Sequence, residues 1–391
     1  MQAFDRLDLS DYVLDESITR RLTSPALVID MAKVRANIRR VLECVGGPDS
    51  WRPHVKTTKS PRIWCELVDR GVRQFKCATA REARALAETM RASDPRGGDV
   101  LLAHPAIGPT LERLGGLAVD FPETRFSVIS EDPEHVEEVS EAVGIFVDVD
   151  FGYLRTGLNV RDHDRVLEVA KAAGARFRGV HYYEGQHTEL DRDDRQAAAF
   201  AGYREVMDLL QRLEAAGVPA RELITSGTPG FLCALAFPGF KDLAMTKHRV
   251  SPGTVVFHDW RAESQIPELG LQPAAVVFTR VISHPGTDRF TCDAGSKSIA
   301  AEAGHPCAYV IGSSQYEAQV PSEEHLPMVV TSGPVPARGT QLYLVAKHIC
   351  PTVNLAEEAV LMDGKELLGL LPISARAHDT LVPEGASSFR S

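Results

Sequence analysis

Short apolar runs alternate with segments of helical periodicity from about residue 50 to residue 254. The apolar runs have the length of buried strands, and the segments between them carry apolar residues three and four positions apart. Eight runs occur, at 52–56, 74–78, 100–103, 126–129, 145–149, 177–182, 223–225 and, weakly, 248–250. This alternation predicts repeated βα units around a parallel sheet.

Eight strands in this length of chain fit a TIM (β/α)8 barrel, which we predict for residues 30–254. A doubly wound open sheet would produce the same alternation and is the alternative. The helix after the first run begins with an expected N-cap, Ser60, and with Pro61 at the first helical position.

The pattern changes after residue 255, where β-branched and aromatic runs are separated by Pro, Gly and Asp. The runs lie at 274–281, 308–311, 328–331 and 341–346. Because no long helical pattern accompanies them, we predict a mainly β second domain over 255–391. Ahead of the barrel, 26–29 predicts a strand and 31–45 a helix. We expect the segment 1–29 to pair with the β domain.

Composition limits the classes of partner. The 391 residues carry a formal net charge of −10 without a basic stripe, which argues against nucleic acid and anionic membranes and favours a small molecule. No apolar stretch reaches the ~20 residues of a membrane span, and the N-terminus lacks a signal core, so we expect a cytoplasmic protein. Seven scattered cysteines, never spaced C-x-x-C, predict reduced thiols.

Lys56 ends the first predicted strand, and functional groups of such barrels lie where strands end. Partial burial there would lower the pKa of the amine and make it a nucleophile for a carbonyl group. A lysine at a strand end is by itself far more often an ordinary surface residue. The assignment therefore depends on the other features of the chain.

Two loops rich in glycine and hydroxyl groups follow the seventh and eighth predicted strands. They are Ser226–Gly230 (SGTPG) and Ser251–Thr254 (SPGT). Glycines let backbone N–H groups approach a phosphate closely, and these two loops of a TIM barrel frequently form a phosphate site. Either loop alone would also fit an ordinary turn, whereas both together favour a phosphorylated ligand.

His348 and Cys350 stand at the end of the run 341–346. If the strand continued, positions i and i+2 would share one face, and an imidazole and a thiolate could bind one metal ion. Zinc prefers these donors, and two protein ligands would leave positions open for water or substrate. A core histidine beside a buried cysteine is the alternative.

Four segments resemble those of the metal-dependent D-threonine aldolase/D-serine dehydratase family. They are Arg52–Lys59 (RPHVKTTK), Ser251–Thr254 with Phe257–Asp259 (SPGT, FHD), Asp293–Lys297 (DAGSK) and His348–Asn354 (HICPTVN). The matches follow the family's order from about residue 24 to 362, which is nearly the whole chain. The resemblance implies a fold-type III pyridoxal phosphate (PLP) enzyme with a barrel, a β domain and an active site between two subunits of a homodimer.

The resemblance also implies roles for single residues. Lys56 would form the Schiff base with PLP, and His348 and Cys350 would bind a divalent metal, with Zn²⁺ favoured and Mn²⁺ an alternative. Arg155 and Tyr183 would lie in the cofactor pocket. The phosphate would be cradled by Ser226, Gly227, Thr228, Gly253 and Thr254.

The reaction implied is a lyase reaction on a D-3-hydroxy-α-amino acid. The H-x-C metal pair is the usual form in dehydratases, so we expect β-elimination, as for D-serine or D-3-hydroxyaspartate. The segments after Tyr183 and Cys350 look more like the aldolases, which keeps retro-aldol cleavage to glycine and an aldehyde as the alternative. Val255 and Ala78 depart from the tyrosine and glutamine that many members carry.

Two further functions stay open. A racemase would need an acid on the face of the substrate opposite Lys56, and it would give the metal pair no role. A non-catalytic PLP carrier would need neither the β domain nor His348 and Cys350. Both therefore leave part of the sequence pattern unexplained.

Overall fold

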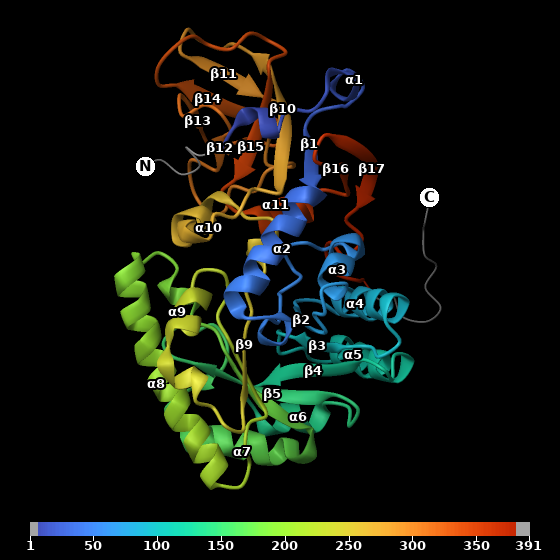
Figure 1. The fold of residues 1–391 in the computed structure, drawn as a ribbon, viewed down its shortest axis with the longest axis vertical. Helices are drawn as coiled ribbons and strands as arrows, with labels where there is room; N and C mark the ends of the chain where they lie inside the picture. The colour runs from blue at the N-terminus through green and yellow to red at the C-terminus, as the bar shows by residue number, and fades with distance from the viewer. Residues whose placement is uncertain (1–6, 381–391) are drawn as a thin grey trace.

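Eight strand positions form a closed barrel in the computed structural model, which describes residues 7–380. Seven parallel strands lie in the order β2, β3, β4, β5, β7, β8, β9. Backbone bridges from Trp51 to Val250 and from His54 to Lys76 join residues 51–54 to both edges of this sheet and close it. The predicted barrel is confirmed, and the open-sheet alternative is wrong (Figure 1).

The barrel elements match the predicted runs closely. The strands are β2 Gln74–Cys77, β3 Asp99–Leu102, β4 Arg125–Ser130, β5 Gly144–Asp150, β7 Phe177–Tyr182, β8 Glu222–Thr225 and β9 Lys247–Val250, with a short β6 Leu158–Asn159 beside β5. The helices are α3 Pro61–Val68, α4 Ala80–Ser93, α5 Pro109–Asp120, α6 Pro133–Glu138, α7 His163–Ala173, α8 Arg192–Ala215 and α9 Phe231–Ala236. Ser60 is the N-cap of α3, although its side chain makes no capping hydrogen bond.

The first predicted strand is not a regular strand. Pro53 has no N–H to donate, so residues 51–54 make only isolated bridges to their neighbours. The N–H of Lys76 donates to the carbonyl of Pro53 and the N–H of Val55 to the carbonyl of Lys76, at 3.0 and 2.8 Å. The hydroxyl of Ser251 also donates to the carbonyl of Arg52, at 2.7 Å. The segment is thus held from both sides.

A buried ionic cluster at the N-terminal ends of the strands supports the same segment. The fully buried Arg52 donates from Nε and Nη2 to the carboxylate of Glu222, at 2.8 and 3.0 Å, and from Nη1 to Asp99, at 2.9 Å. Arg178 and Arg249 pair with the same two carboxylates. Since every charge there has a partner, the cluster can be buried, and it fixes the chain that leads to Lys56.

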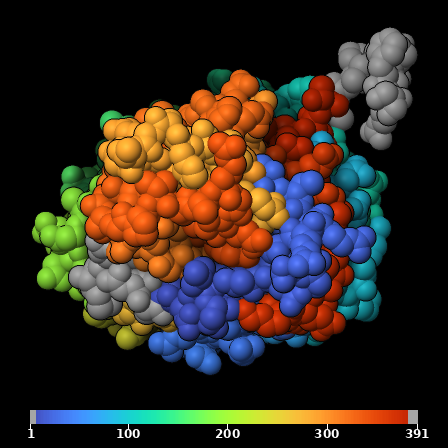
Figure 2. All heavy atoms as spheres, turned by 90° about the horizontal axis from the view of Figure 1, so that it is seen from above, coloured from blue at the N-terminus to red at the C-terminus, as the bar shows by residue number. Residues whose placement is uncertain are grey.

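The second sheet combines both ends of the chain. Its strands are β1 Ala26–Asp30, β10 Ala275–Ser283, β11 Arg289–Cys292, β12 Ala308–Val310, β13 Tyr316–Ala318, β14 Leu326–Val330, β15 Gln341–Ala346, β16 Glu358–Asp363 and β17 Glu366–Pro372. The N-terminal strand β1 lies antiparallel to β10 and parallel to β16. Figure 2 shows blue residues from the early part of the described chain next to red residues from its late part on this end of the molecule. Its short helices are α1 Glu16–Thr19, α10 Trp260–Gln265 and α11 Ile349–Leu355, and α2 Met31–Val45 leads from β1 to the barrel.

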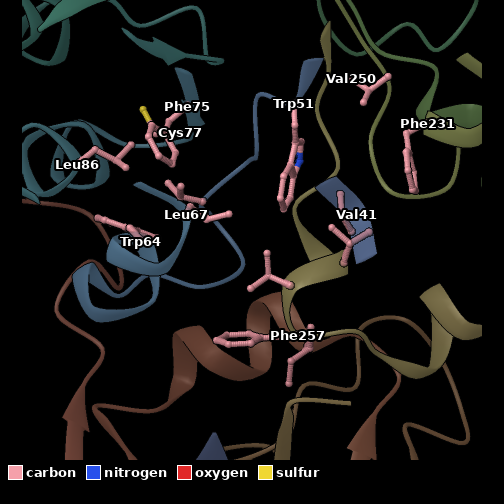
Figure 3. Close-up of a cluster of buried hydrophobic side chains, with 14 of the residues drawn as sticks. Val41, Trp51, Trp64, Leu67, Phe75, Cys77, Leu86, Phe231, Val250 and Phe257 are labelled. Atoms are coloured by element: carbon pink, nitrogen blue, oxygen red, sulfur yellow. The ribbon is translucent and has the colours of Figure 1, made fainter. Parts of the chain in front are cut away.

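One large apolar cluster joins the two parts. It runs from barrel residues such as Trp51, Trp64 and Val250 to Phe257 and on to the β domain (Figure 3). A smaller cluster inside the barrel contains Leu101, Ile129, Phe146 and Ile224. This continuous packing holds the β domain against the C-terminal ends of the barrel strands. No helix within residues 7–380 is long and apolar enough to cross a membrane.

Candidate active site

Two adjoining cavities, of about 680 and 290 Å³, lie where the barrel strands end and the β domain covers them. Five of the predicted site residues line both cavities: Lys56, Arg155, Tyr183, His348 and Cys350. Four more line the smaller cavity: Gly227, Thr228, Gly253 and Thr254. Nine of the ten residues singled out from the sequence are thus brought together.

Lys56 lies in a turn directly after the bridge between His54 and Lys76. Its side chain is exposed, so the expected partial burial is wrong. The neighbouring residues 52–55 are hydrogen-bonded to β2 and to the end of β9, which places an exposed side chain on a well-supported backbone. The amine is therefore free to react with a ligand in either cavity.

The predicted phosphate loops have the geometry of a cradle. A Cβ atom at Gly253 would lie 2.2 Å from the carbonyl oxygen of His54, and one at Gly227 would lie 2.9 Å from the ring of Tyr183. The loops therefore need glycine at both positions. The hydroxyl of Thr228 is buried and has no hydrogen-bond partner within the described chain. A buried hydroxyl without a partner is costly, so this atom is suited to a polar ligand.

Ser226 is the exception among the predicted residues. It lines neither cavity, and its hydroxyl donates to the carboxylate of Glu184 and lies 3.1 Å from the hydroxyl of Tyr203. Its φ of 62° turns the loop so that Gly227 and Thr228, and not Ser226, face the cavity. The side chain of Ser226 is thus a support of the loop, which corrects the predicted contact with a phosphate.

Arg155 and Tyr183 stack at the boundary of the two cavities. The guanidinium of Arg155 lies 4.7 Å from the ring centre of Tyr183, and the ring of Tyr153 meets that of Tyr183 edge-on at 5.9 Å. Burial raises the pKa of Tyr183 to about 12, so it is a neutral phenol at physiological pH. These contacts fix a cation and a flat aromatic surface beside the cavity.

His348 and Cys350 do not lie on a strand. Strand β15 ends at Ala346, and His348 is the N-cap of helix α11, whose first turn contains Cys350. The carboxylate of Asp259 accepts the N–H of Ile349, at 2.9 Å, and so fixes the turn between them. The two side chains still hydrogen-bond to each other. The predicted shared strand face is wrong, but the helix start brings the same pair together.

Each side chain of the pair shifts the pKa of the other. Burial lowers the pKa of His348, but the hydrogen bond and charge of Cys350 outweigh it and raise that pKa to about 9. Burial raises the pKa of Cys350, and His348 more than reverses this effect. Glu302 accepts from Nδ1 of His348 at 2.5 Å. Within residues 7–380 no third His, Cys, Asp or Glu completes a metal-binding group, so this site offers two protein donors.

Three polar residues in the barrel were not singled out from the sequence. Lys76 of β2, which also lines both cavities, lies with Nζ 3.4 Å from Nε2 of His181. Nδ1 of His181 lies 2.7 Å from Asp148. The available signal was a lysine inside the buried run 74–78, where a charged side chain is out of place.

Comparison with protein-family models identifies the barrel. The model of the alanine racemase N-terminal domain matches residues 29–259. The chain belongs to the alanine racemase N-terminal domain family. The model of a serine dehydratase domain matches residues 274–362, in the β domain of this family member. The predicted membership of the fold-type III PLP enzymes is confirmed.

Relatives of this family member share nearly its whole length. A D-threonine aldolase of Arthrobacter sp. is 27% identical over 371 residues, which cover 91% of this chain and 93% of the relative. The structure of the D-threonine aldolase of Filomicrobium marinum superposes with a TM-score of 0.77 at 23% identity, covering 90% and 95% of the two chains. That of the D-threo-3-hydroxyaspartate dehydratase of Delftia sp. gives 0.72 at 21% identity, covering 92% and 99%. The two structures share the fold of this chain.

Proposed function

We propose that this protein is a lyase that uses PLP and a divalent metal to act on D-3-hydroxy-α-amino acids, by β-elimination to a 2-oxo acid and ammonia. The observation that carries the proposal is that Lys56 and the pair His348 and Cys350 line the same two cavities. A reactive amine and a metal-binding pair can then act on one small molecule. The Arthrobacter aldolase and the Delftia dehydratase support a lyase acting on a D-amino acid.

The residues present fit PLP. The Lys56 amine would bind the cofactor's carbonyl carbon, and the phosphate would lie between the two glycine loops, where the hydroxyl of Thr228 lacks a partner. Thr254 would add a second hydroxyl, and Arg155 and Tyr183 would border the ring. When bound, PLP supplies an electron sink for the bonds of the substrate's α-carbon.

The residues present also fit a divalent metal, with Zn²⁺ favoured by the nitrogen and sulfur donors and Mn²⁺ as the alternative. Nδ1 of His348 is engaged by Glu302, so Nε2 would be the ligand beside the thiolate of Cys350. When bound, the metal supplies a Lewis acid for the substrate's 3-hydroxyl group. With two protein donors, the remaining coordination positions are left for water and substrate.

The protein's own residues would then have separate roles in the reaction. The exposed Lys56 amine would hold the cofactor next to the substrate's α-carbon. Asp259 and Glu302 hold the metal donors in place through Ile349 and His348. Burial of the cavity walls by the β domain limits access of water to the reacting atoms.

Retro-aldol cleavage to glycine and an aldehyde is the second candidate. The segment after Tyr183 and the segment Pro351–Asn354 favour it, since both resemble the aldolases more than the dehydratases. Both reactions would use the metal at the same 3-hydroxyl group. In elimination this group leaves as the C–O bond breaks, whereas in retro-aldol cleavage it loses its proton and the Cα–Cβ bond breaks. Racemisation and simple PLP storage leave the metal pair without a role.

One experiment separates these reactions. The purified protein, loaded with PLP and with Zn²⁺ or Mn²⁺, is incubated with D-serine, D-threonine and D-3-hydroxyaspartate, and four products are measured. Ammonia with a 2-oxo acid supports elimination, whereas glycine with an aldehyde supports retro-aldol cleavage. Full activity after removal of the metal by a chelator would refute the metal's role, and no turnover of any substrate would refute the lyase.

A further inference from the structure

Lys76 is an unusual lysine in this molecule. It is only 4% exposed, yet it makes no ion pair with a carboxylate in residues 7–380. The other two buried lysines are paired, Lys33 with Asp30 at 2.5 Å and Lys59 with Glu82 at 2.8 Å. A buried ammonium without a direct partner is strongly disfavoured, so this side chain favours its neutral amine form.

The hydrogen-bond network behind Lys76 fixes the direction of its amine. Asp148 and His181 are register neighbours on β5 and β7, and the carboxylate of Asp148 lies 2.7 Å from Nδ1 of His181. The hydroxyl of Thr156 donates to the other oxygen of Asp148, also at 2.7 Å. Because a carboxylate accepts the Nδ1 proton, Nε2 of the neutral ring is an acceptor, and Lys76 can donate to it.

The charges around Lys76 agree with this geometry. Burial lowers the pKa of Lys76 most, the charges of Lys56 and Arg155 lower it further, and Glu184 and Asp148 partly oppose them, which gives about 7.

Three uncharged groups complete the surroundings. Burial and nearby cations lower the pKa values of His54 and His181, and burial raises the pKa of Tyr183. All three are neutral near pH 7, so Lys76 is the amine in this part of the cavity whose charge changes there.

We propose that Lys76 is a second catalytic amine of the active site, which exchanges a proton with the bound amino acid while His181 and Asp148 hold it in place. The inference rests on the proposed lyase function. In elimination, the neutral Nζ takes the proton of the α-carbon, the electron pair of that C–H bond forms the new double bond, and the ammonium returns the proton to the leaving hydroxyl oxygen as the C–O bond breaks. In retro-aldol cleavage, Nζ takes the proton of the 3-hydroxyl group, the electron pair of that O–H bond forms the aldehyde carbonyl as the C–C bond breaks, and the ammonium returns the proton to the α-carbon of glycine.

The first test is the pH dependence of kcat for the holoenzyme. In the wild type, activity should rise with pH through about 7 as Lys76 loses its proton. Lys76→Met should remove this rise and lower kcat by roughly 100-fold or more, the usual effect of losing a general base. Lys76→Arg, which keeps a permanent positive charge, should not restore the activity.

Asp148→Asn provides a directional control. Loss of this carboxylate removes an interaction that favours the ammonium, so the rise in activity should move to lower pH rather than disappear. If Lys76→Met kept the wild-type pH profile, the proton-transfer role would be refuted. Absence of turnover in the wild type would instead refute the lyase function, so the two failures can be told apart.

The second test needs neither turnover nor a variant. Trace acetylation of the holoenzyme across pH 5 to 10, read by mass spectrometry, reports the protonation of each lysine. Lys76 should titrate near 7, well below the ~10.4 of a lysine in a model peptide. Titration of Lys76 at the model-peptide value would refute the proposal.

Discussion

Oε1 of Glu302 lies 2.5 Å from Nδ1 of His348, so the carboxylate orients the ring and leaves Nε2 as the nitrogen that would bind a metal. Carboxylates that orient a metal-binding histidine usually contribute 10- to 100-fold to metal affinity. We therefore expect Glu302→Gln to weaken Zn²⁺ binding by roughly this factor, measured by competition with a chromophoric chelator. Glu141→Gln, at an exposed glutamate ahead of β5, is the control and should bind Zn²⁺ like the wild type. Equal affinities of the two variants would contradict this role for Glu302.

Lys56, and not Lys76, should carry the covalently bound PLP. Both lysines line the same cavities, but Lys56 is exposed on a rigid turn whereas Lys76 is buried against His181. After reduction with borohydride, peptide mass spectrometry should place the label on Lys56, and Lys56→Ala should abolish it. A label on Lys76 in the wild type would overturn the assignment.

Gly253→Ala should damage both stability and cofactor binding. The new Cβ would lie 2.2 Å from the carbonyl of His54, so the backbone that leads to Lys56 must shift. We expect a loss of about 1 to 3 kcal/mol of unfolding free energy, from denaturant titration, together with weaker PLP binding. The matched control is Gly116→Ala in α5, where nothing lies within 4 Å, and which should be neutral or stabilising. Wild-type PLP affinity in Gly253→Ala would refute the close approach.

The stability of the wild-type protein should increase with pH above neutrality because of the lowered pKa of Lys76. The folded-state pKa of about 7 lies below the unfolded value, so the unfolded chain binds more protons between about 7 and 10.5. Stability must therefore rise with pH across this window. In thermal unfolding, the stability of Lys76→Met relative to the wild type should be greatest at pH 7 and smallest at pH 10. An equal difference at both values would mean that Lys76 is charged in the folded state.

The enzyme should act on D-3-hydroxy amino acids and not on their L-enantiomers. Three contacts would fix the substrate. The cofactor held at Lys56 would bind its nitrogen, the metal would bind its hydroxyl, and cationic side chains that line the cavities, such as Arg155, would bind its carboxylate. Inversion at the α-carbon would misplace one of these groups, and a shift of ~1 Å can cost ~100-fold in rate. Comparable kcat/KM values for D- and L-serine, and for D- and L-threonine, would refute this arrangement.

Much of the fold could be predicted because its elements are local. The α2 helix starts and ends where its apolar periodicity does, between Met31 and Val45. The prediction of a regular first strand is wrong for a reason that is also local, because Pro53 has no N–H group for a regular ladder of hydrogen bonds. The start of α11 is also a local matter. Pro351 lies in the first turn of this helix, where proline is favoured, and it therefore indicates a helix rather than a continued strand at His348 and Cys350.

The site residues could be predicted from the sequence only where they belong to a contiguous motif. The glycine loops and the H-x-C pair are contiguous in sequence, and they lie in one place in the fold. Lys76 and His181 are 105 positions apart and meet only because β2 and β7 face the same barrel interior. The orientation of Ser226 likewise depends on Glu184 and Tyr203, which no local pattern connects to it.

The bridged segment 51–54 also bears on how the protein is made. The bond from Ser251 reaches Arg52 across 199 positions, so the segment has one of its two neighbours missing until residue 251 has been synthesised. At roughly 5 to 20 residues per second, that delay is on the order of 10 to 40 s. During it, Trp51 and the incomplete sheet expose apolar surface and an unpaired strand edge to solvent or to chaperones. The reactive amine at Lys56 thus acquires its rigid support only when most of the chain has left the ribosome.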